Sequence, residues 1–581
     1  MPILNIGFLA HVDAGKTSLT ERVLFETATI SSIGEVDTGT TQTDTLELER
    51  QRGITIQSAV VSFRIRDLKV NLIDTPGHAD FIAEVDRALS ALDAVVIVIS
   101  AVEGVQPQTR KLVRAVRELH LPMIIFCNKI DRIGARADIL LLEIERKLGL
   151  NLFAMNQPSG MGSLAASTHD HDLADPEVSR LLIDRLSLQS DEFVRTWIAT
   201  EGHPSARAVR NAFRRQVRDG SIVPTYFGSA ISGAGVPALL NGMYHLLPRA
   251  PELCEDAASG RVFKIQRGPT GEKLVYLRLR SGELHNRQVL AGPTWESRVT
   301  GIEQFDSGSS QSIHAVSAGE IVRVHGLREA RIGDAIGIAS EDLEYQRPFA
   351  PPALESVVRP IRPDQTVALF SALQQLVEQD PLIDVRRNHR DSEISVRLFG
   401  EVQKEVIASM LATDFGLEVA FEPSQVICIE RPSGIGSAYE EMGSGNPFAA
   451  GLWLRIEPGN PGSGVTFRRP SGALPLAFYV AIEETVYLTL QEGLRGWQVD
   501  DVVVTVTQTA YSSPSTVAAD FRGLTPLVVM DALRIAGTDV LEPVLAFELQ
   551  VPTDVLGRVL PVLVSYRGLP ASTVEDQDEC L

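Results

Sequence analysis

The stretch at residues 5–24 reads NIGFLAHVDAGKTSLTERVL and gives the first indication of the fold. It begins as an apolar strand, turns at HVDAGKT, and continues with the apolar spacing of a helix. A glycine followed by a lysine and a hydroxyl residue, at a turn from strand to helix, is typical of a loop that binds nucleotide phosphates. In such a loop backbone N–H groups face the phosphates, Lys16 reaches the outer ones, and Thr17 binds Mg²⁺.

The match to the phosphate-loop pattern G-x-x-x-x-G-K-[ST] is imperfect, because Ala10 stands where the first glycine is expected. A glycine-containing turn with a solvated lysine is the alternative, and the loop alone does not decide between the two. The candidate phosphate-loop residues are Ala10, His11, Val12, Asp13, Ala14, Gly15, Lys16 and Thr17.

A second stretch, VNLIDTPGH, places an aspartate at the tip of another apolar strand. Asp74 can bind Mg²⁺ through water, and the N–H of Gly77 could meet the γ-phosphate of a nucleotide. Taken alone, Asp74 has an alternative role as a helix cap. The candidate residues here are Asp74, Thr75, Pro76, Gly77 and His78.

Two further stretches predict that the base is guanine. PMIIFCNKID ends a buried strand with Asn128, Lys129, Ile130 and Asp131. A carboxylate at that place accepts hydrogen bonds from both N1–H and the 2-amino group of guanine, a pairing that adenine does not offer. VPTYFGSA adds Ser229 and Ala230, whose loop could contact the guanine carbonyl oxygen. Each stretch could also be an ordinary turn, but four elements in this order favour a GTP site.

Between the first two stretches lies TTQTDTLELERQRGIT, at residues 40–55, which is polar and strongly charged. It is typical of a switch segment that GTP orders and hydrolysis releases. The hydroxyl of Thr55 could reach Mg²⁺, so the predicted metal ligands are Thr17, Thr55 and Asp74. The charged residues Glu47, Glu49, Arg50 and Arg52 are interpreted as the solvated surface of a helix.

Apolar strands at 3–10, 70–74, 94–100, 122–128 and 223–229 alternate with helical patterns, which predicts a doubly wound α/β domain with its ligand at the carboxyl ends of the strands. Residues 151–220 are expected to be its least regular part. Arg207, Arg210, Arg214 and Arg218 are spaced to lie on one helix face there. Such a stripe is usually only solvated, and RNA contact is the alternative.

The rest of the chain predicts further domains. Short β-like runs separated by glycine turns indicate a small β-barrel. A β-α-β-β-α-β pattern then suggests a ferredoxin-like domain, followed by a second α+β domain. The predicted boundaries are 1–248 for the GTP-binding domain, 258–342 for the barrel, 353–426 for the ferredoxin-like domain, 427–541 for the second α+β domain, and 542–581 for a partial ferredoxin-like half-domain.

Composition excludes several classes of protein. The formal net charge of −20 argues against a protein that coats nucleic acid non-specifically. The four cysteines show no CxxC spacing, so neither a zinc site nor a disulfide framework is indicated. The longest apolar run, AVVIVISAV, is about half the length needed to cross a bilayer. We therefore expect a cytoplasmic, monomeric protein with no membrane partner.

The residue after DTPG indicates a subclass. A histidine there, with HVDAGKT and RGITI upstream, resembles the translational GTPases that work on the ribosome. The resemblance implies that His78 orients the attacking water when ribosomal RNA brings it into place, and that Lys16 and His78 are the catalytic residues. Val12 and Ile54 match the apolar gate of that family, with plain packing as the alternative.

The order of domains resembles elongation factor G, and more closely the tetracycline-resistance ribosomal-protection proteins. Stretches such as LERQRGITIQ, DTPGHADFIAEVDRALSALD, LFGEVQKEV and SPSTVAADFR carry this likeness, which extends from residue 2 to about residue 558. It implies a GTPase that uses GTP and Mg²⁺, is stimulated by the ribosome, and releases tetracycline from it.

By the same resemblance, a loop at the tip of the fourth domain displaces the drug. The candidate loop residues are Tyr511, Ser512, Ser513, Pro514 and Ser515. The loop departs from the family at Ser512, where a second aromatic is expected, and at Ala518, which replaces proline. A plain polar turn is the alternative interpretation.

The end of the chain departs furthest from the family, which closes with a complete second ferredoxin-like domain and a helix. Only a strand and a helix are expected here, which suggests a truncated or frameshifted reading frame. A disordered acidic tail is expected at Glu575, Asp576, Asp578 and Glu579. The alternative functions are an elongation factor G-like translocase, another ribosome-associated GTPase, or a decayed paralogue that binds GTP without hydrolysing it.

Overall fold

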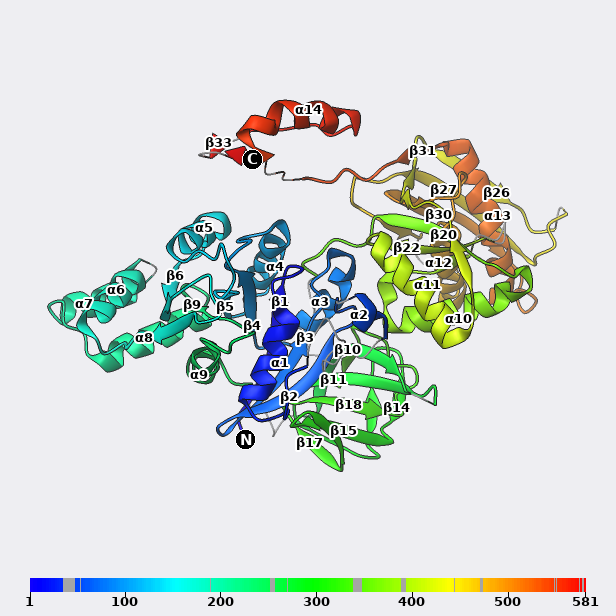
Figure 1. Cartoon of the computed structure of the whole chain (residues 1–581). Helices are drawn as coiled ribbons and strands as arrows, with labels where there is room; N and C mark the ends of the chain where they lie inside the picture. Colours follow the sequence, from blue (N-terminus) through cyan, green and yellow to red (C-terminus); the bar gives the residue numbers. More distant parts are fainter. Residues whose placement is uncertain are drawn as a thin grey trace. The chain divides into compact units, whose positions relative to one another are not determined.

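Figure 1 shows the computed structural model of the whole chain. The chain forms two compact units, Met1–Ser424 and Gln425–Leu581. The structure describes residues 1–34, 47–52, 54–188, 190–250, 257–268, 270–337, 347–387, 393–443, 445–470, 474–547, 549, 551–573, 575–576 and 579–580. Residues 40–46 and Gly53 of the predicted switch segment, and residues 251–256 of the stretch between the first two predicted domains, lie outside this description.

The first unit opens with a seven-stranded sheet in the order β2-β3-β1-β4-β5-β9-β6. All neighbours in it are parallel except β2, which pairs with β3 in the antiparallel sense at one edge. The five central strands are buried along their whole length, as expected of a parallel sheet with both faces covered. The prediction of a doubly wound α/β domain is confirmed. The strands are β1 (Ile3–Ala10), β2 (Ala59–Ile65), β3 (Leu68–Asp74), β4 (Ala94–Ser100), β5 (Met123–Asn128), β6 (Leu152–Ala154) and β9 (Val223–Phe227).

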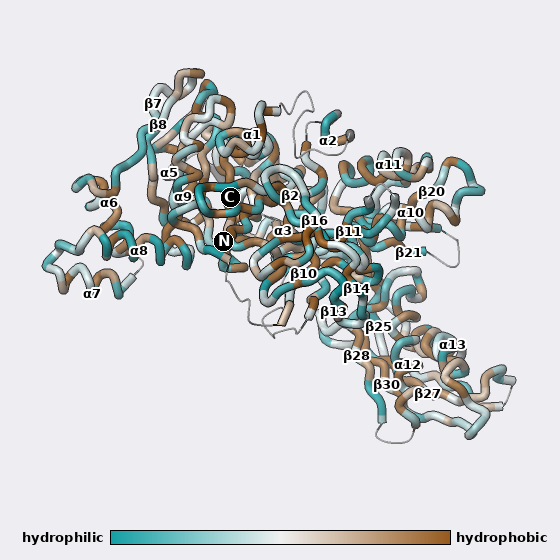
Figure 2. The backbone as a smooth tube through the Cα atoms, turned by 90° about the horizontal axis from the view of Figure 1, so that it is seen from below, coloured by the Kyte–Doolittle hydropathy of each residue, from teal (hydrophilic) through white to brown (hydrophobic). Residues whose placement is uncertain are grey.

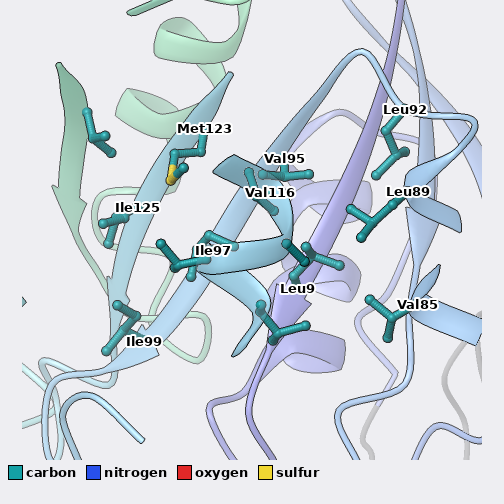
Figure 3. Close-up of a cluster of buried hydrophobic side chains, with 14 of the residues drawn as sticks. Leu9, Val85, Leu89, Leu92, Val95, Ile97, Ile99, Val116, Met123 and Ile125 are labelled. Carbon is teal, nitrogen blue, oxygen red and sulfur yellow. The ribbon is translucent and has the colours of Figure 1, made fainter. Parts of the chain in front are cut away.

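Helices cover both faces of this sheet. One face packs against α1 and α9, and the other packs against α3, α4 and α5. Successive residues of β4 point to opposite faces, so that Val95 and Ile97 join one core while Val96 and Val98 join the other. Figure 3 shows Val95 and Ile97 beside Leu9 in the first of these cores. The helices are α1 (Lys16–Glu26), α2 (Glu47–Arg52), α3 (Ile82–Leu89), α4 (Pro107–Glu118), α5 (Asp138–Leu148) and α9 (Val236–Leu246).

Residues 151–220 are more regular than expected, and that prediction was wrong. They form the hairpin β7 (Asn156–Ser159) and β8 (Ser167–Asp170), and then α6 (Pro176–Ser187), α7 (Asp191–Ala199) and α8 (Ala206–Arg218). The side chains of Asp175, Ser190 and Ser205 cap the three helices by accepting hydrogen bonds from first-turn N–H groups.

The arginine stripe lies where its spacing predicted. Hydrophilic and hydrophobic residues alternate along α8 (Figure 2), and the apolar side of the helix packs through Val209, Phe213 and Val217. The stripe residues are all exposed, and they are Arg207, Arg210, Arg214 and Arg218.

The next part of the first unit is a β-barrel-like domain, as predicted. Its main sheet has six strands in the order β16-β15-β18-β11-β10-β19, and two further strand pairs, β12-β17 and β13-β14, accompany it. The strands are β10 (Ser259–Arg267), β11 (Lys273–Ser281), β12 (Glu283–His285), β13 (Val289–Ala291), β14 (Glu296–Arg298), β15 (Gly301–Asp306), β16 (Ser309–Ile313), β17 (Ala315–Ser317), β18 (Ile321–His325) and β19 (Ala335–Ile336).

A ferredoxin-like domain completes the first unit. Its strands lie in the order β21-β22-β20-β23, which is the arrangement that a β-α-β-β-α-β chain adopts when it folds as a split βαβ unit. The elements are β20 (Leu354–Pro360), α10 (Thr366–Gln379), β21 (Arg386–Arg387), β22 (Ile394–Leu398), α11 (Glu401–Phe415), β23 (Val419–Phe421), and the short 3-10 turns η3 (Pro363–Gln365) and η4 (Pro381–Ile383).

The second unit contains an α+β domain with its own core. Two helices, α12 (Leu476–Thr489) and α13 (Ala518–Ala536), pack on one face of the sheet β26-β27-β30-β28. A smaller sheet has the order β29-β25-β31. The strands of these two sheets are β25 (Ile429–Pro432), β26 (Gly436–Glu440), β27 (Ala450–Pro458), β28 (Val465–Arg468), β29 (Gln498–Val499), β30 (Val502–Tyr511) and β31 (Thr538–Leu541).

The last residues form the expected helix, but the strand expected before it is limited to two residues, and the tail also differs from its prediction. β32 (Val551–Pro552) precedes α14 (Leu556–Ser565), and β33 (Glu575–Asp576) and β34 (Glu579–Cys580) join β32 in a small sheet. The backbone of Glu575, Asp576 and Glu579 therefore lies in strands rather than in a disordered tail, while Asp578 lies outside the described residues. Among the residues that the structure describes, no helix has the length and apolar character that crossing a bilayer requires.

Candidate functional site

The four predicted motifs meet at one edge of the first sheet. They follow β1, β3, β5 and β9, which are parallel, so their carboxyl ends point the same way. β1 and β3 are direct neighbours with Phe8 opposite Asp74, which brings the first two motifs together. This is the edge at which doubly wound sheets bind ligands.

Gly15 of the phosphate loop has a backbone conformation that would strain any other residue. Gly15 has φ 85° and caps the start of α1, a left-handed conformation that side chains rarely adopt. A Cβ atom there would lie 2.4 Å from Nδ2 of Asn128. Asp13, also at positive φ, is exposed, while Ala14 is buried. The loop therefore presents backbone and the start of α1, rather than bulky side chains, to a ligand.

Lys16 and Asp74 meet in the buried floor of the site. Nζ of Lys16 donates to Oδ1 of Asp74 at 2.5 Å, and the two side chains are 6% and 0% exposed. The hydroxyl of Thr20 donates to the same oxygen at 3.3 Å. The lysine is thus held at the floor of the loop by the carboxylate of the second motif.

The other two predicted metal ligands are in contact. Oγ1 of Thr17 lies 3.2 Å from Oγ1 of Thr55, although 38 residues separate them. Hydroxyl and carboxylate oxygens are the donors that Mg²⁺ prefers, so the residues present fit this ion. Among the described residues, no three His, Cys, Asp or Glu side chains gather as a metal cluster, and the predicted set of two hydroxyls and one carboxylate is of a different kind.

Glu49 corrects the expectation of a solvated charged helix. α2 is present as predicted, but Glu49 is 0% exposed and its Oε1 accepts from the N–H groups of Ile56 at 2.9 Å and Gln57 at 3.0 Å. It therefore holds the backbone directly after Thr55. Nothing in the charged run ELERQR distinguishes Glu49 as the residue that bonds these backbone N–H groups. Arg50 is exposed as expected, and the side chains of Glu47 and Arg52 lie outside the description.

Asn128 connects three of the four motifs. Its Nδ2 donates to the carbonyl of Ala14 at 2.8 Å, and its Oδ1 accepts from the N–H of Ala230 at 2.9 Å. The sequence placed Asn128 in the base pocket, whereas its side-chain contacts here link the phosphate loop to the loop after β9. A sequence motif does not reveal these two hydrogen bonds, because both partners of Asn128 are backbone groups.

Ion pairs and hydrogen bonds also hold the remaining residues of the two base motifs. Asp131 is 6% exposed, and Lys129 forms an ion pair with Glu103 at 3.2 Å. The N–H of Ile130 donates to the carbonyl of Gly228 at 3.3 Å. Oγ of Ser229 accepts from the N–H of Ser232 at 3.1 Å, which closes the last loop. The NKID and GSA loops therefore lie against each other.

His78 begins a short 3-10 turn, η1 (Ala79–Phe81), directly after the second motif. Its Nδ1 accepts a hydrogen bond from the N–H of Asp80 at 3.2 Å, and its side chain is 29% exposed. Because Nδ1 accepts, the neutral ring carries its proton on Nε2. Before it, Thr75 and Pro76 are buried, and the Thr75 hydroxyl donates to the carbonyl of Phe8 at 2.9 Å.

Gly77 lies between the two phosphate-site motifs. A Cβ there would lie 3.5 Å from the carbonyl oxygens of Ala10 and His11, which is ordinary contact. Of the two predicted gate residues, Val12 is half-buried, and Ile54 packs against a cluster of Ile56, Phe81 and Val406. Their role as a gate stays a prediction.

His11 is a buried histidine, and neither its burial nor its contact with α4 was predicted from the sequence. Its Nδ1 lies 3.1 Å from the hydroxyl of Thr109 at the start of α4. Burial lowers the pKa of His11 to about 4, although the nearby carboxylate of Glu103 opposes this shift. The ring is therefore neutral at physiological pH and lies buried against Thr109.

The candidate loop of the second unit is a compact turn between β30 and α13. The N–H of Ser512 donates to the hydroxyl of Thr516 at 2.8 Å, and the hydroxyl of Ser515 donates to the carbonyl of Ser512 at 3.1 Å. Tyr511 is 41% exposed, and its ring meets Phe478 edge-on. Ser513 and Pro514 are exposed. The contacts suit a polar turn that presents side chains to solvent.

Three family models match the chain. They are the elongation factor Tu GTP binding domain at residues 1–249, elongation factor G domain III at 349–423, and elongation factor G domain IV at 425–537. Among similar curated proteins, the oxytetracycline resistance protein of Streptomyces rimosus is 44% identical over 99% of this chain and 89% of that protein. The chain belongs to the tetracycline resistance protein family.

Two other members of the family are also similar to this chain over nearly its full length. The tetracycline resistance protein TetM of Streptomyces lividans is 43% identical over 97% of this chain and 89% of its own length, and TetO of Campylobacter jejuni is 35% identical over 100% and 90%. A crystal structure of a Thermus thermophilus protein shares the fold, with a TM-score of 0.69 at 24% identity over 100% of this chain and 92% of that one. This tetracycline resistance family member is thus a GTPase whose GTP-binding domain is the first one.

Proposed function

We propose that this chain is a ribosome-dependent GTPase that binds the ribosome and releases tetracycline from it, so that translation continues in the presence of the drug. The observation that carries the proposal is the contact between the hydroxyls of Thr17 and Thr55 beside the Lys16–Asp74 pair. It joins a phosphate loop to the end of a switch segment, in a chain whose relatives are named as tetracycline resistance proteins.

The site residues have separate tasks in this proposal. The start of α1 and Lys16 bind the phosphates, and Asp131 with the loop of Ser229 and Ala230 selects guanine. Thr17, Thr55 and Asp74 would hold Mg²⁺, which supplies neutralisation of the charge on the phosphate oxygens when it is bound.

His78 orients the attacking water, and the chemistry is mainly placement and electrostatic stabilisation. A neutral ring with its proton on Nε2 suits this task, because that nitrogen can donate to a water molecule. Lys16 forms an ion pair with Asp74, which keeps the ammonium group of the lysine beside the predicted magnesium ligands.

Release of the drug is assigned to the loop at Tyr511–Ser515 in the second unit, whose exposed side chains are free to contact a ribosomal surface. GTP promotes the ribosome-bound form by holding Thr55, and hydrolysis releases the switch segment and the protein. The proposal includes a monomeric protein that works in the cytoplasm, where ribosomes are.

The test replaces His78 with alanine and compares it with His169→Ala, since His169 is an exposed histidine on β8 remote from the motifs in sequence. We expect His78→Ala to bind GTP with nearly normal affinity in calorimetry but to lose roughly 100-fold or more of ribosome-stimulated turnover. His169→Ala should match the wild type in both measurements.

Expression in a tetracycline-sensitive host completes the test. Wild-type protein should raise the tolerated drug concentration, and His78→Ala should raise it less. Ribosome-stimulated turnover without any rise in tolerance would favour a translocase-like protein instead. GTP binding without turnover would favour a binding module that does not hydrolyse GTP.

A further inference from the structure

Helix α11 of the ferredoxin-like domain starts without a cap of its own. Its N-cap residue is Gly400, which has no side chain to accept hydrogen bonds from the first-turn N–H groups. Those groups are nevertheless bonded. Oδ2 of Asp80, in the turn after His78, accepts from the N–H of Val402 at 2.9 Å and of Gln403 at 3.2 Å.

This contact places a carboxylate at the positive end of a helix, where a negative charge is stabilised. It joins two residues that lie 322 and 323 positions apart in the sequence. One carboxylate of the nucleotide-binding domain therefore supplies the cap of a helix in another domain of the same unit.

Gly400 is required by this contact and not by its own backbone conformation. Its φ of −177° is extended backbone that any residue adopts. A Cβ atom at this position, however, would lie 2.3 Å from both carboxylate oxygens of Asp80. Gly400→Ala would thus displace the carboxylate of Asp80 without changing the residue type at position 80.

Asp80 also touches the proposed water-orienting histidine. Its N–H donates to Nδ1 of His78 at 3.2 Å, and its Oδ1 lies 3.5 Å from the same nitrogen. The hydrogen bond at Nδ1 sets which ring nitrogen carries the proton. The carboxylate that caps α11 and the N–H that bonds the imidazole therefore belong to one residue, so the cap holds in place the backbone group that orients His78.

Apolar contacts surround this polar link. Phe81, which follows Asp80, forms a buried cluster with Ile56 from beside Thr55 and Val406 from α11. Val402 and Met410 of the same helix pack against that cluster. Both segments that flank the predicted magnesium site, at Ile56 and at Phe81, therefore rest on one face of α11.

We propose that Asp80 is a positioning residue for GTP hydrolysis, which the start of α11 holds in place so that it fixes the ring of His78. Docking of the ferredoxin-like domain on the switch residues is then a condition for turnover. The inference rests on the proposed role of His78. Its alternative is an ordinary domain contact that contributes to stability alone.

The test uses Asp80→Ala and Gly400→Ala in the full chain. Each should lower kcat for ribosome-stimulated GTP hydrolysis about 10-fold to 100-fold, since misplacement of a catalytic group has effects of this size. The KM for GTP should stay within about twofold of wild type. Ser205→Ala removes the cap of α8, and Gly557→Ala adds a methyl group where nothing lies within 4 Å, so both should retain wild-type kcat.

Two double variants separate positioning from stability. Gly400→Ala should have no further effect in the Asp80→Ala background, because the clash and the cap are then both gone. Asp80→Ala should have no further effect in the His78→Ala background if it acts only through that ring. Additive losses in either pair would overturn the inference.

A measurement on the free protein does not depend on the ribosome. Amide hydrogen exchange at Val402 and Gln403 should become faster in both single variants and stay unchanged in the two controls. If Asp80→Ala folds poorly, Asp80→Asn, which keeps one acceptor oxygen, should show the same changes to a smaller extent. Wild-type kcat in Asp80→Ala would refute the positioning role, whereas a wild-type protein without ribosome-stimulated turnover would refute the proposed function itself.

Discussion

At the scale of single residues, the phosphate site depends on side chains that are buried and neutral or paired. His11 is the clearest case, because burial lowers its pKa to about 4 while the ring keeps its bond to Thr109. A charged imidazole would lose solvation there without gaining a partner of equal strength. Protonation therefore favours the unfolded chain, where a histidine has a pKa near 6.5.

This gives a pH prediction with a definite sign. Between pH 6.5 and 4 the unfolded chain binds the proton of His11 and the folded chain does not, so the contribution of this residue to the unfolding free energy falls as pH falls. The loss between pH 7 and pH 5 is about 2 kcal/mol. Urea unfolding of wild type and of His11→Asn, which keeps an acceptor for Thr109, measures it. The variant should lose about 2 kcal/mol less over this range, and equal losses would contradict the assignment.

At the scale of elements, the strand β3 is bound to the barrel domain through a buried ion pair. Nζ of Lys69 lies 2.8 Å and 2.9 Å from the two oxygens of Glu320, and both side chains are almost completely buried. Nε2 of Gln304 donates to Glu320 at 2.7 Å, which satisfies the carboxylate further. Arg64 and Asp306 form a second pair between the same domains, at 3.3 Å on the surface.

The two pairs should respond differently to removal of one partner. Lys69→Met leaves the charge of Glu320 buried without its counter-ion and should lower the unfolding free energy by about 3–5 kcal/mol. The double variant Lys69→Met/Glu320→Gln should recover most of that loss.

Arg64→Met is the matched control, and it should cost only about 0–1 kcal/mol because its pair is solvated. Urea unfolding of the four proteins checks these values. A loss at Arg64 as large as that at Lys69 would show that burial is not the deciding factor.

At the scale of the whole molecule, each of the two units has its own hydrophobic core. Two clusters fill the faces of the seven-stranded sheet in the first unit, and a third fills the α+β domain of the second. All predicted GTP-site residues lie in the first unit, and the candidate drug-site loop lies in the second. GTP binding and drug release should therefore be separable.

A chain that ends at Ser424 tests this separation. It should fold, because it keeps the cores of the first unit, and it should bind GTP within a few-fold of the full chain in calorimetry. In a sensitive host it should confer no tetracycline tolerance. The control is a full chain with Tyr511→Ala, which should bind GTP normally. Loss of GTP binding in the shortened chain would mean that the nucleotide site needs the second unit.

The sequence predicted five of the seven strands of the first sheet, but not β2 or β6. It also predicted the order of the domains and the strand ends at which the four motifs lie. These features follow from local chemistry, since buried parallel strands are continuous apolar runs and phosphate loops need glycine at fixed positions. The same local reasoning missed α6 and α7, because both helices are only weakly apolar, although their caps at Asp175 and Ser190 were readable. The arginine spacing did indicate α8. Local reasoning failed again at Glu49, because a glutamate in a charged helix has the same local sequence whether its side chain is solvated or buried against backbone N–H groups.

Which distant residues come into contact depends on the packing of the folded chain. The contacts of Thr17 with Thr55, of Asn128 with Ala14 and Ala230, and of Asp80 with the start of α11 join positions 38 to 323 residues apart. No local pattern encodes such pairs, because each depends on how whole elements pack and on backbone groups that every residue possesses. Residue types therefore indicate the chemistry of the site, and packing determines which groups hold it in place.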